Sequence, residues 1–185
     1  MKLWRIYDHN APYAKRPGWN VLDGQGGVFA SARWHHAGTP VLYAAPNPSL
    51  AMLEVLVHID STQFGERSAI ELDVSRKSIE VLTLEHFFQL VRDAPKDDSQ
   101  RLTRDYGTQW LHENRSLLLE VPSLIMPFER NCLINSNHPE VKRIRLLRTE
   151  RVRLDARLVR GQTKTVAITG KINAHVPLRN SPVTF

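Results

Sequence analysis

The sequence predicts a single domain of the α+β class, because strand patterns and helix patterns are mixed without regular βαβ alternation. Three observations support this prediction: an apolar strand pattern at residues 41–44, a capped helix pattern at residues 47–58, and alternating arginines and apolar residues at residues 143–154. The 185 residues suffice for one domain with a buried core.

The first 40 residues are rich in glycine, proline and aromatic side chains, so they predict one short strand at residues 3–7 followed mostly by loop. Residues 24–27 contain three glycines and resemble a phosphate-binding loop only superficially, because such a motif needs a strand before it and a helix after it. We therefore interpret them as a plain loop. A turn at residues 38–40 then precedes the strand at residues 41–44.

The next element, the helix at residues 47–58, has the clearest local signals. Asn47 can cap it and Pro48 suits its first position, and apolar residues recur after them at helical spacing. Glu54 lies in the middle of the helix, and His58 follows one turn later on the same face.

Further elements are predicted as strands at residues 69–74 and 78–82, helices at residues 84–92 and 99–114, and an apolar strand at residues 117–126. The second of these helices should be interrupted near Gly107. The last strand should bend or reach a sheet edge at Pro122, because proline has no N–H for the sheet. The alternation at residues 143–154 predicts two strands with a turn near Thr149 and Glu150, and four arginines on one face.

Positive charge is concentrated at the C-terminal end. The formal net charge is +6, yet residues 1–141 carry a net −3, residues 142–158 carry +5, and residues 159–185 carry +4 without any acidic residue. This change in composition predicts a domain boundary near Leu158, with residues 1–158 as the domain and residues 159–185 as an extension of unknown role.

The Arg-rich strands have several interpretations. A solvated face is the ordinary one, and a ridge that binds phosphate groups or acidic proteins is an alternative. A nucleic-acid-binding module at residues 142–185 is another, but residues 140–184 contain no aromatic side chain for stacking on bases. We therefore expect no direct contact with nucleic acid.

Composition also limits the cellular class. Cys132 is the single cysteine, which excludes a disulfide framework and fits a reducing cytoplasm. No apolar run approaches the roughly 20 residues that span a bilayer, and the start lacks the apolar core of a signal peptide. We expect a cytoplasmic protein without membrane contact.

No Walker loop, Gly-x-Ser-x-Gly elbow or His-Glu-x-x-His motif is present, so the candidates are single residues. Glu54 is flanked by apolar residues on both sides, and it is either the exposed position of an amphipathic helix or a partly buried carboxylate in a site. His58 is either its partner or a helix-end histidine favoured by the helix dipole.

Arg33 precedes Trp34, His35 and His36, just before a turn. Arginine is the natural bidentate partner of a phosphate group. Adjacent histidines suggest metal, but no cysteine or acid stands at ligand spacing nearby, so we expect no metal site. The structural alternative is a polar strand end with Trp34 packed inward.

Other polar positions have ordinary structural explanations. Tyr43 ends an apolar strand, where a tyrosine usually packs its ring and exposes its hydroxyl. Ser123 follows a proline, and no base that would make it a nucleophile is evident. The asparagine-rich residues 131–139 favour turns and caps.

Taken together, these motifs resemble the RES domain, a family named for an arginine, a glutamate and a serine. The matching strings lie at residues 31–34, 38–44, 49–58, 119–123, 131–139 and 155–158. The residues that name the family fall at Arg33, Glu54 and Ser123. Three positions depart from the family's pattern, with Ala32 in place of the usual glycine, His35 in place of the usual asparagine, and Ser136 in place of the first proline of the family's Asn-Pro-x-His-Pro motif. Nothing at residues 159–185 resembles the family.

The resemblance implies a bacterial toxin paired with an Xre-type, helix-turn-helix antitoxin in a hetero-oligomer, and a fold similar to that of ADP-ribosyltransferase toxins. It implies a reaction on NAD+ as substrate, with no other cofactor. The nicotinamide–ribose bond is broken by hydrolysis or phosphorolysis, or ADP-ribose is transferred to a protein.

The resemblance also implies roles for the candidate residues. Glu54 would stabilise positive charge that develops on the ribose, and Arg33 would bind a phosphate group. Tyr43 would stack on nicotinamide or its ribose, and Ser123 would donate a hydrogen bond to the ribose, the amide or Glu54.

Overall fold

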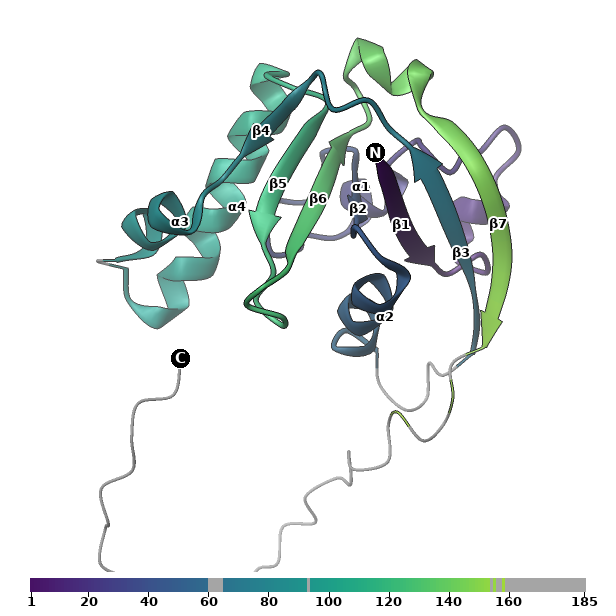
Figure 1. Cartoon of the computed structure of the whole chain (residues 1–185), viewed down its shortest axis with the longest axis horizontal. Helices are drawn as coiled ribbons and strands as arrows, with labels where there is room; N and C mark the ends of the chain where they lie inside the picture. Colours follow the sequence, from purple (N-terminus) through teal and green to yellow (C-terminus); the bar gives the residue numbers. More distant parts are fainter. Residues whose placement is uncertain (60–64, 93, 154, 156–157, 159–185) are drawn as a thin grey trace, which may run out of the picture.

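The computed structural model describes residues 1–59, 65–92, 94–153, 155 and 158, arranged as Figure 1 shows. The strands are β1 (Lys2–Tyr7), β2 (Val41–Ala44), β3 (Glu66–Asp73), β4 (Ile79–Val81), β5 (Leu118–Pro122), β6 (Arg130–Asn135) and β7 (Arg145–Arg153). The helices are α1 (Gln25–Phe29), α2 (Pro48–Leu56), α3 (Leu84–Val91) and α4 (Lys96–Glu113), with short 3-10 helices at Pro12–Lys15 and Pro139–Arg143. The predicted extension, residues 159–185, lies outside the described residues.

Two sheets form the frame of the domain. One has the strand order β1-β3-β7 and is antiparallel, and the other has the order β2-β6-β5-β4, in which β4 runs parallel to β5. A backbone bridge between Trp4 and Ala45 ties the end of β2 to β1. This mixed architecture confirms the predicted α+β class.

Buried apolar clusters hold these layers together. One cluster lies between the two sheets and includes Leu72 and Leu118, and a second packs α3 and α4 on the four-stranded sheet around Trp110. A third seats α2 on the three-stranded sheet through Leu50. Because burying one such apolar side chain contributes about 2 kcal/mol, these contacts fix where α2 and α4 lie.

The glycine-rich residues 24–27 do not form a plain loop, and the prediction was wrong here. Gly24 has a left-handed backbone (φ 64°) and precedes the short helix α1. A side chain at Gly27 would place its Cβ 2.5 Å from the carbonyl oxygen of Thr39. The glycines therefore allow α1 to pack closely against the residues that lead into β2.

α4 is continuous, and the predicted interruption at Gly107 was also wrong. A Cβ at Gly107 would lie 1.9 Å from the carbonyl oxygen of Trp34, so this glycine lets the helix touch the backbone of the segment that carries Arg33. Within the described part of the chain, no helix has the length and apolar character needed to cross a bilayer.

The predicted hairpin at residues 143–154 is instead the single strand β7. Thr149 and Glu150, expected in a turn, pair with residues of β3. A register shift in the β3–β7 pairing puts Arg145 and Arg148 opposite Asp73 and Glu71, whereas Arg151 and Arg153 lie opposite Ser68 and Glu66. Because alternate positions of β3 point to opposite faces, Arg145 lies on one face and Arg151 and Arg153 lie on the other, while Arg143, the fourth arginine of the prediction, precedes β7 in a 3-10 helix. The predicted single face of arginines was therefore wrong.

Candidate active site

Glu54, Ser123 and Asn131 meet at one carboxylate oxygen. Oε1 of Glu54 accepts a hydrogen bond from Ser123 Oγ at 3.1 Å and one from Asn131 Nδ2 at 2.5 Å. Ser123 follows the end of β5, and Asn131 lies opposite Val121 in the β5–β6 pairing. Among the described residues no partner contacts Oε2 of Glu54, so this second oxygen is available to a ligand.

Local sequence signals place Glu54 at this point. The side chain of Asn47 caps α2 by accepting from the backbone N–H of Leu50 at 2.8 Å, and Pro48 occupies the first turn, as predicted. Leu50 and Ala51 are buried against β1 and β3, and Glu54 follows them at a spacing of four and three residues, so it lies near the same face of the helix, the face that turns toward the domain. The helix ends at Leu56 rather than at His58.

Glu54 is partly buried and hydrogen-bonded, as a carboxylate in a site would be, but its partners differ from the predicted one. Its hydrogen bonds in the described part of the chain come from Ser123 and Asn131, not from His58, which is exposed. His58 was the partner that helix spacing suggested. His58 lies beyond the end of α2 at Leu56, so helical spacing no longer determines where it lies relative to Glu54.

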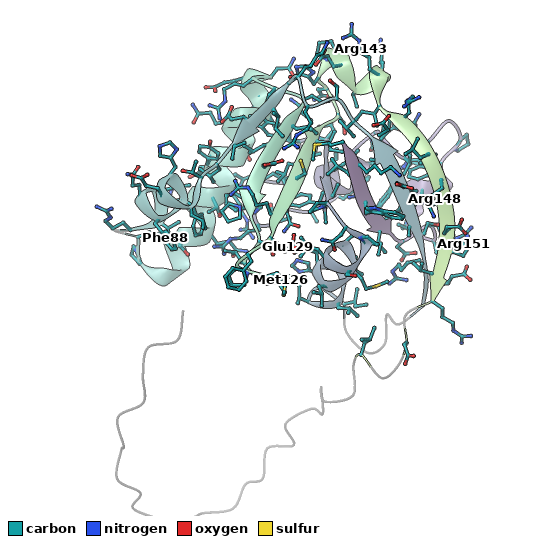
Figure 2. The ribbon with its side chains drawn as sticks, in the orientation of Figure 1. Phe88, Met126, Glu129, Arg143, Arg148 and Arg151 are labelled. Carbon is teal, nitrogen blue, oxygen red and sulfur yellow. The ribbon has the colours of Figure 1, made fainter. Side chains whose placement is uncertain are left out.

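The hydroxyl of Ser123 is fully used by the protein. It donates to Glu54 and accepts from the backbone N–H groups of Ile125 at 3.3 Å and Met126 at 3.1 Å. A hydroxyl offers one donor and two acceptor positions, so Ser123 has no lone pair left for nucleophilic attack. Figure 2 labels Met126 and Glu129 in the turn after β5, which this serine holds beside Glu54.

Pro122 explains why β5 ends here. β4 pairs with β5 only as far as Glu120, so the strand has an open side at Pro122, where a missing N–H is harmless. This confirms the predicted edge position of the proline.

Asn131 was missed by the sequence analysis, which assigned residues 131–139 to turns and caps. That interpretation fits Asn135, whose amide donates to the backbone carbonyl of Leu111 and to Asn114 at the end of α4. Asn131 differs because it is only 8% exposed and its Oδ1 has no hydrogen-bond partner among the described residues. A polar residue at the start of an apolar strand was the available signal.

Tyr43 anchors the segment that carries Arg33. Its hydroxyl accepts from the backbone N–H of Trp34 at 3.2 Å and lies 2.8 Å from Nδ1 of His35. The other ring nitrogen of His35 lies 3.2 Å from the carbonyl oxygen of Gly27. A carbonyl only accepts, so Nε2 carries the proton and Nδ1 accepts from Tyr43.

Burial keeps both of these groups neutral. It lowers the pKa of the His35 imidazole and raises the pKa of the Tyr43 hydroxyl. Charges on both sides act on the pKa of Tyr43 as well: Arg104 and Arg5 lower it, and Glu54 raises it. The hydroxyl of Tyr43 therefore lies within electrostatic range of both Glu54 and Arg104.

Arg33 is held through its backbone, not its side chain. Oγ1 of Thr103 donates to the carbonyl oxygen of Arg33 at 2.9 Å. The Nε of Arg33 is buried without a partner among the described residues. Burial lowers the pKa of this guanidinium, and the nearby charge of Arg104 lowers it further. Trp34 packs inward, as the structural alternative predicted, and phosphate binding by Arg33 stays a prediction.

The adjacent histidines have separate structural roles. His35 bonds to Tyr43 and Gly27, whereas Nε2 of His36 lies 2.6 Å from Asp105 of α4. No group of three metal-ligating side chains occurs among the described residues.

A family model described as "RES domain" matches residues 2–155. A curated protein of Pseudomonas putida, "Toxin Res", is 40% identical over 143 residues, which cover 77% of this chain and 89% of that protein. The "Prs ADP-ribosylating toxin" of Sphingobium sp. is 31% identical over 159 residues, covering 85% of this chain and 96% of that protein. A chain in the crystal structure of the M. tuberculosis MbcT–MbcA toxin–antitoxin complex has a similar fold, with a TM-score of 0.63 at 13% identity, covering 83% of this chain and 84% of that chain.

Proposed function

The chain belongs to the family of RES-domain toxins, and from this premise we propose that it degrades NAD+ by cleaving the bond between nicotinamide and ribose. The observation that carries the proposal is the carboxylate of Glu54, which Ser123 and Asn131 hold by one oxygen while the other remains available.

This arrangement suits the chemistry. When the bond between C1′ and nicotinamide breaks, its electron pair goes to the ring nitrogen and positive charge develops on the ribose, as in glycoside hydrolysis. A fixed carboxylate beside the sugar stabilises that charge without having to reorient. Nicotinamide leaves as a neutral molecule, so no strong acid is needed to protonate it. An oxygen of water or of inorganic phosphate then forms the new bond to C1′.

The remaining candidates complete the binding site in this proposal. Arg33 binds a phosphate group of NAD+ through its free guanidinium, and the ring of Tyr43 stacks on nicotinamide or its ribose. Ser123 acts on the substrate through Glu54, since its hydroxyl is already committed to that carboxylate. NAD+ is the substrate, and the reaction needs no metal or further cofactor.

Transfer of ADP-ribose to a protein is the second candidate, because one of the relatives is named as an ADP-ribosylating toxin. Both reactions break the same bond and require the same hold on NAD+. They differ only in the acceptor, which is water or phosphate in one case and a protein side chain in the other.

An antitoxin is the proposed partner. The similar fold in a toxin–antitoxin complex supports this, and the family resemblance makes an Xre-type protein the expected kind. We propose that the two proteins form a hetero-oligomer in the cytoplasm.

The test uses purified full-length protein, freed of partner, incubated with NAD+ and phosphate, with products identified by mass spectrometry. The wild type should consume NAD+, and Glu54→Gln should lose nearly all activity while Glu85→Gln, an exposed change on α3, should not. Consumption at the wild-type rate by Glu54→Gln would show that this carboxylate is not catalytic. Label from adenine-labelled NAD+ that appears on a protein would identify a transferase instead.

A further inference from the structure

We propose that Arg104 is a second phosphate-binding residue and forms, with Arg33, a paired guanidinium site for the diphosphate of a dinucleotide. This inference rests on the proposed function, because it identifies the part of NAD+ that the arginines contact. No sequence pattern singled out Arg104, which lies within α4.

The backbone around Arg33 and the side chains of α4 are joined directly. Nε of Arg104 donates to the carbonyl oxygen of Ala32 at 2.8 Å, and the neighbouring Thr103 donates to the carbonyl oxygen of Arg33. One turn further along α4, Gly107 touches the backbone of Trp34. These contacts bring the two arginines to the same place from segments about 70 residues apart.

The two guanidinium groups lack carboxylate partners of the kind that Arg101, on the same helix as Arg104, has among the described residues. Among the described residues neither Arg33 nor Arg104 forms an ion pair, although each is partly buried. Arg101, on the same helix, pairs with Asp98 and Asp105. The repulsion between the paired arginines also shows in the pKa of Arg33, which Arg104 lowers. Partly buried like charges of this kind call for a bound anion.

A diphosphate fits the donors that remain. Nε of Arg104 is used for Ala32, which leaves its two terminal nitrogens, and the whole guanidinium of Arg33 is unused. Each can form a forked pair of hydrogen bonds to one phosphate group. Arg104 and Glu54 both act on the pKa of Tyr43, and the Tyr43 hydroxyl accepts from the backbone N–H of Trp34, next to Arg33, so the arginines and the carboxylate lie near the same tyrosine. This arrangement suits a dinucleotide such as NAD+, in which one ribose separates the diphosphate from nicotinamide. The arginines would contact the diphosphate, and Glu54 would lie beside C1′ of that ribose.

The site should therefore favour ligands with a diphosphate over ligands with one phosphate. We would measure the binding of ADP-ribose and of nicotinamide mononucleotide to the full chain by calorimetry. The variant Arg104→Gln should bind ADP-ribose at least tenfold more weakly and lose most of the preference over the mononucleotide. Arg101→Gln, a matched change at an exposed position on the same helix, should bind both like the wild type.

A purely structural role of Arg104 would give a different result. Loss of its bond to Ala32 alone would weaken both ligands equally and leave the salt dependence of ADP-ribose binding unchanged. The proposal requires a selective loss and a shallower salt dependence. Arg104→Lys keeps a cation without the fork, so it provides a second, milder variant that should bind ADP-ribose with intermediate affinity. Equal binding of ADP-ribose by the wild type and both variants would overturn the inference.

Failure of the inference and failure of the proposed function are distinguishable. If the wild type consumes NAD+ and Arg104→Gln binds ADP-ribose normally, Arg104 has no role and the function stands. If Arg104 is needed for ADP-ribose binding but NAD+ is not consumed, the diphosphate site stands and the reaction is a different one.

Discussion

The arginines of β7 and the pair Arg33–Arg104 differ in what surrounds their charges. On β7, Arg148 pairs with the buried Glu71 and Arg145 pairs with Asp73 across the sheet. Figure 2 shows Arg148 and Arg151 along the outer edge of the molecule, on β7. Arg33 and Arg104 lie on the segment before β2 and on α4, where the described residues offer them no carboxylate.

This difference shows why net charge was a poor guide to function. The whole excess of basic residues falls at residues 142–185, yet acids of β3 already neutralise part of it. The partly exposed pair Arg145–Asp73 contributes little to stability, and both pairs occupy guanidinium groups that an outside anion would otherwise contact. Segment 1–141, with its net −3, holds Arg33 and Arg104, which form no ion pair among the described residues. The nucleic-acid interpretation of the basic strand loses support for the same reason.

The largest effect is expected at Asn131, which donates a hydrogen bond to Glu54 in the proposed NAD+ site and has no counterpart on β7. Asn131→Ala removes one of two donors to this carboxylate, so kcat for NAD+ consumption should fall about 10- to 100-fold, as expected for a charge-assisted hydrogen bond of about 1.5–3 kcal/mol. KM should change little, because the donor contacts Glu54 and not the substrate. Asn137→Ala, at an exposed position, is the control; an unchanged kcat for Asn131→Ala would remove this residue from the site.

A smaller effect, on ligand affinity, is expected from the same Arg→Lys change made at Arg33 and at Arg148 of β7. Arg33→Lys should weaken the binding of NAD+ or ADP-ribose about tenfold, because a point charge replaces a guanidinium fork. Arg148→Lys on β7 should leave binding unchanged. Calorimetry on both variants tests the comparison directly, and it fails if the β7 variant loses as much affinity as the Arg33 variant.

The smallest effect concerns stability on the β7 side. Glu71 accepts from Lys2 and Arg148, and these bonds lower its pKa below the 4.5 of an unperturbed glutamate. A lowered folded pKa means that its stabilisation is present above pH 4.5 and is lost as the pH falls through the folded pKa. Glu71→Gln should therefore be less stable than the wild type at pH 7, with a difference that narrows in acid. Urea unfolding at several pH values, with Glu150→Gln as control, measures this; a constant gap would contradict it.

Elements with local signals could be predicted from the sequence. β2 has the predicted bounds, and α2 begins at the predicted cap because Asn47 and Pro48 act within the first turn. Errors arose where a distant segment decides the structure. β7 continues through Thr149 because β3 provides partners along its whole length, and α4 continues through Gly107 because the carbonyl of Trp34 fills the space of the absent side chain.

The candidate site divides in the same way. Glu54 stood out because it is a lone charge among apolar residues, and the family resemblance added Ser123, which proved to be its neighbour. Asn131 and Arg104 have no comparable signal. Their roles depend on contacts with residues about 70 positions away, which become visible only when the chain has folded.

The absence of a side chain at Gly107 has a mechanical consequence. Backbone meets backbone at this point, and close-packed atoms of this kind cannot be compressed. Two hydrogen bonds reinforce this contact, because Thr103 and Arg104 donate to the carbonyl oxygens of Arg33 and Ala32. The position of the segment that carries Arg33 is therefore tied to that of α4, whereas Glu54 is carried by a separate helix, α2. We expect that a protein that presses on α4 would shift Arg33 relative to Glu54.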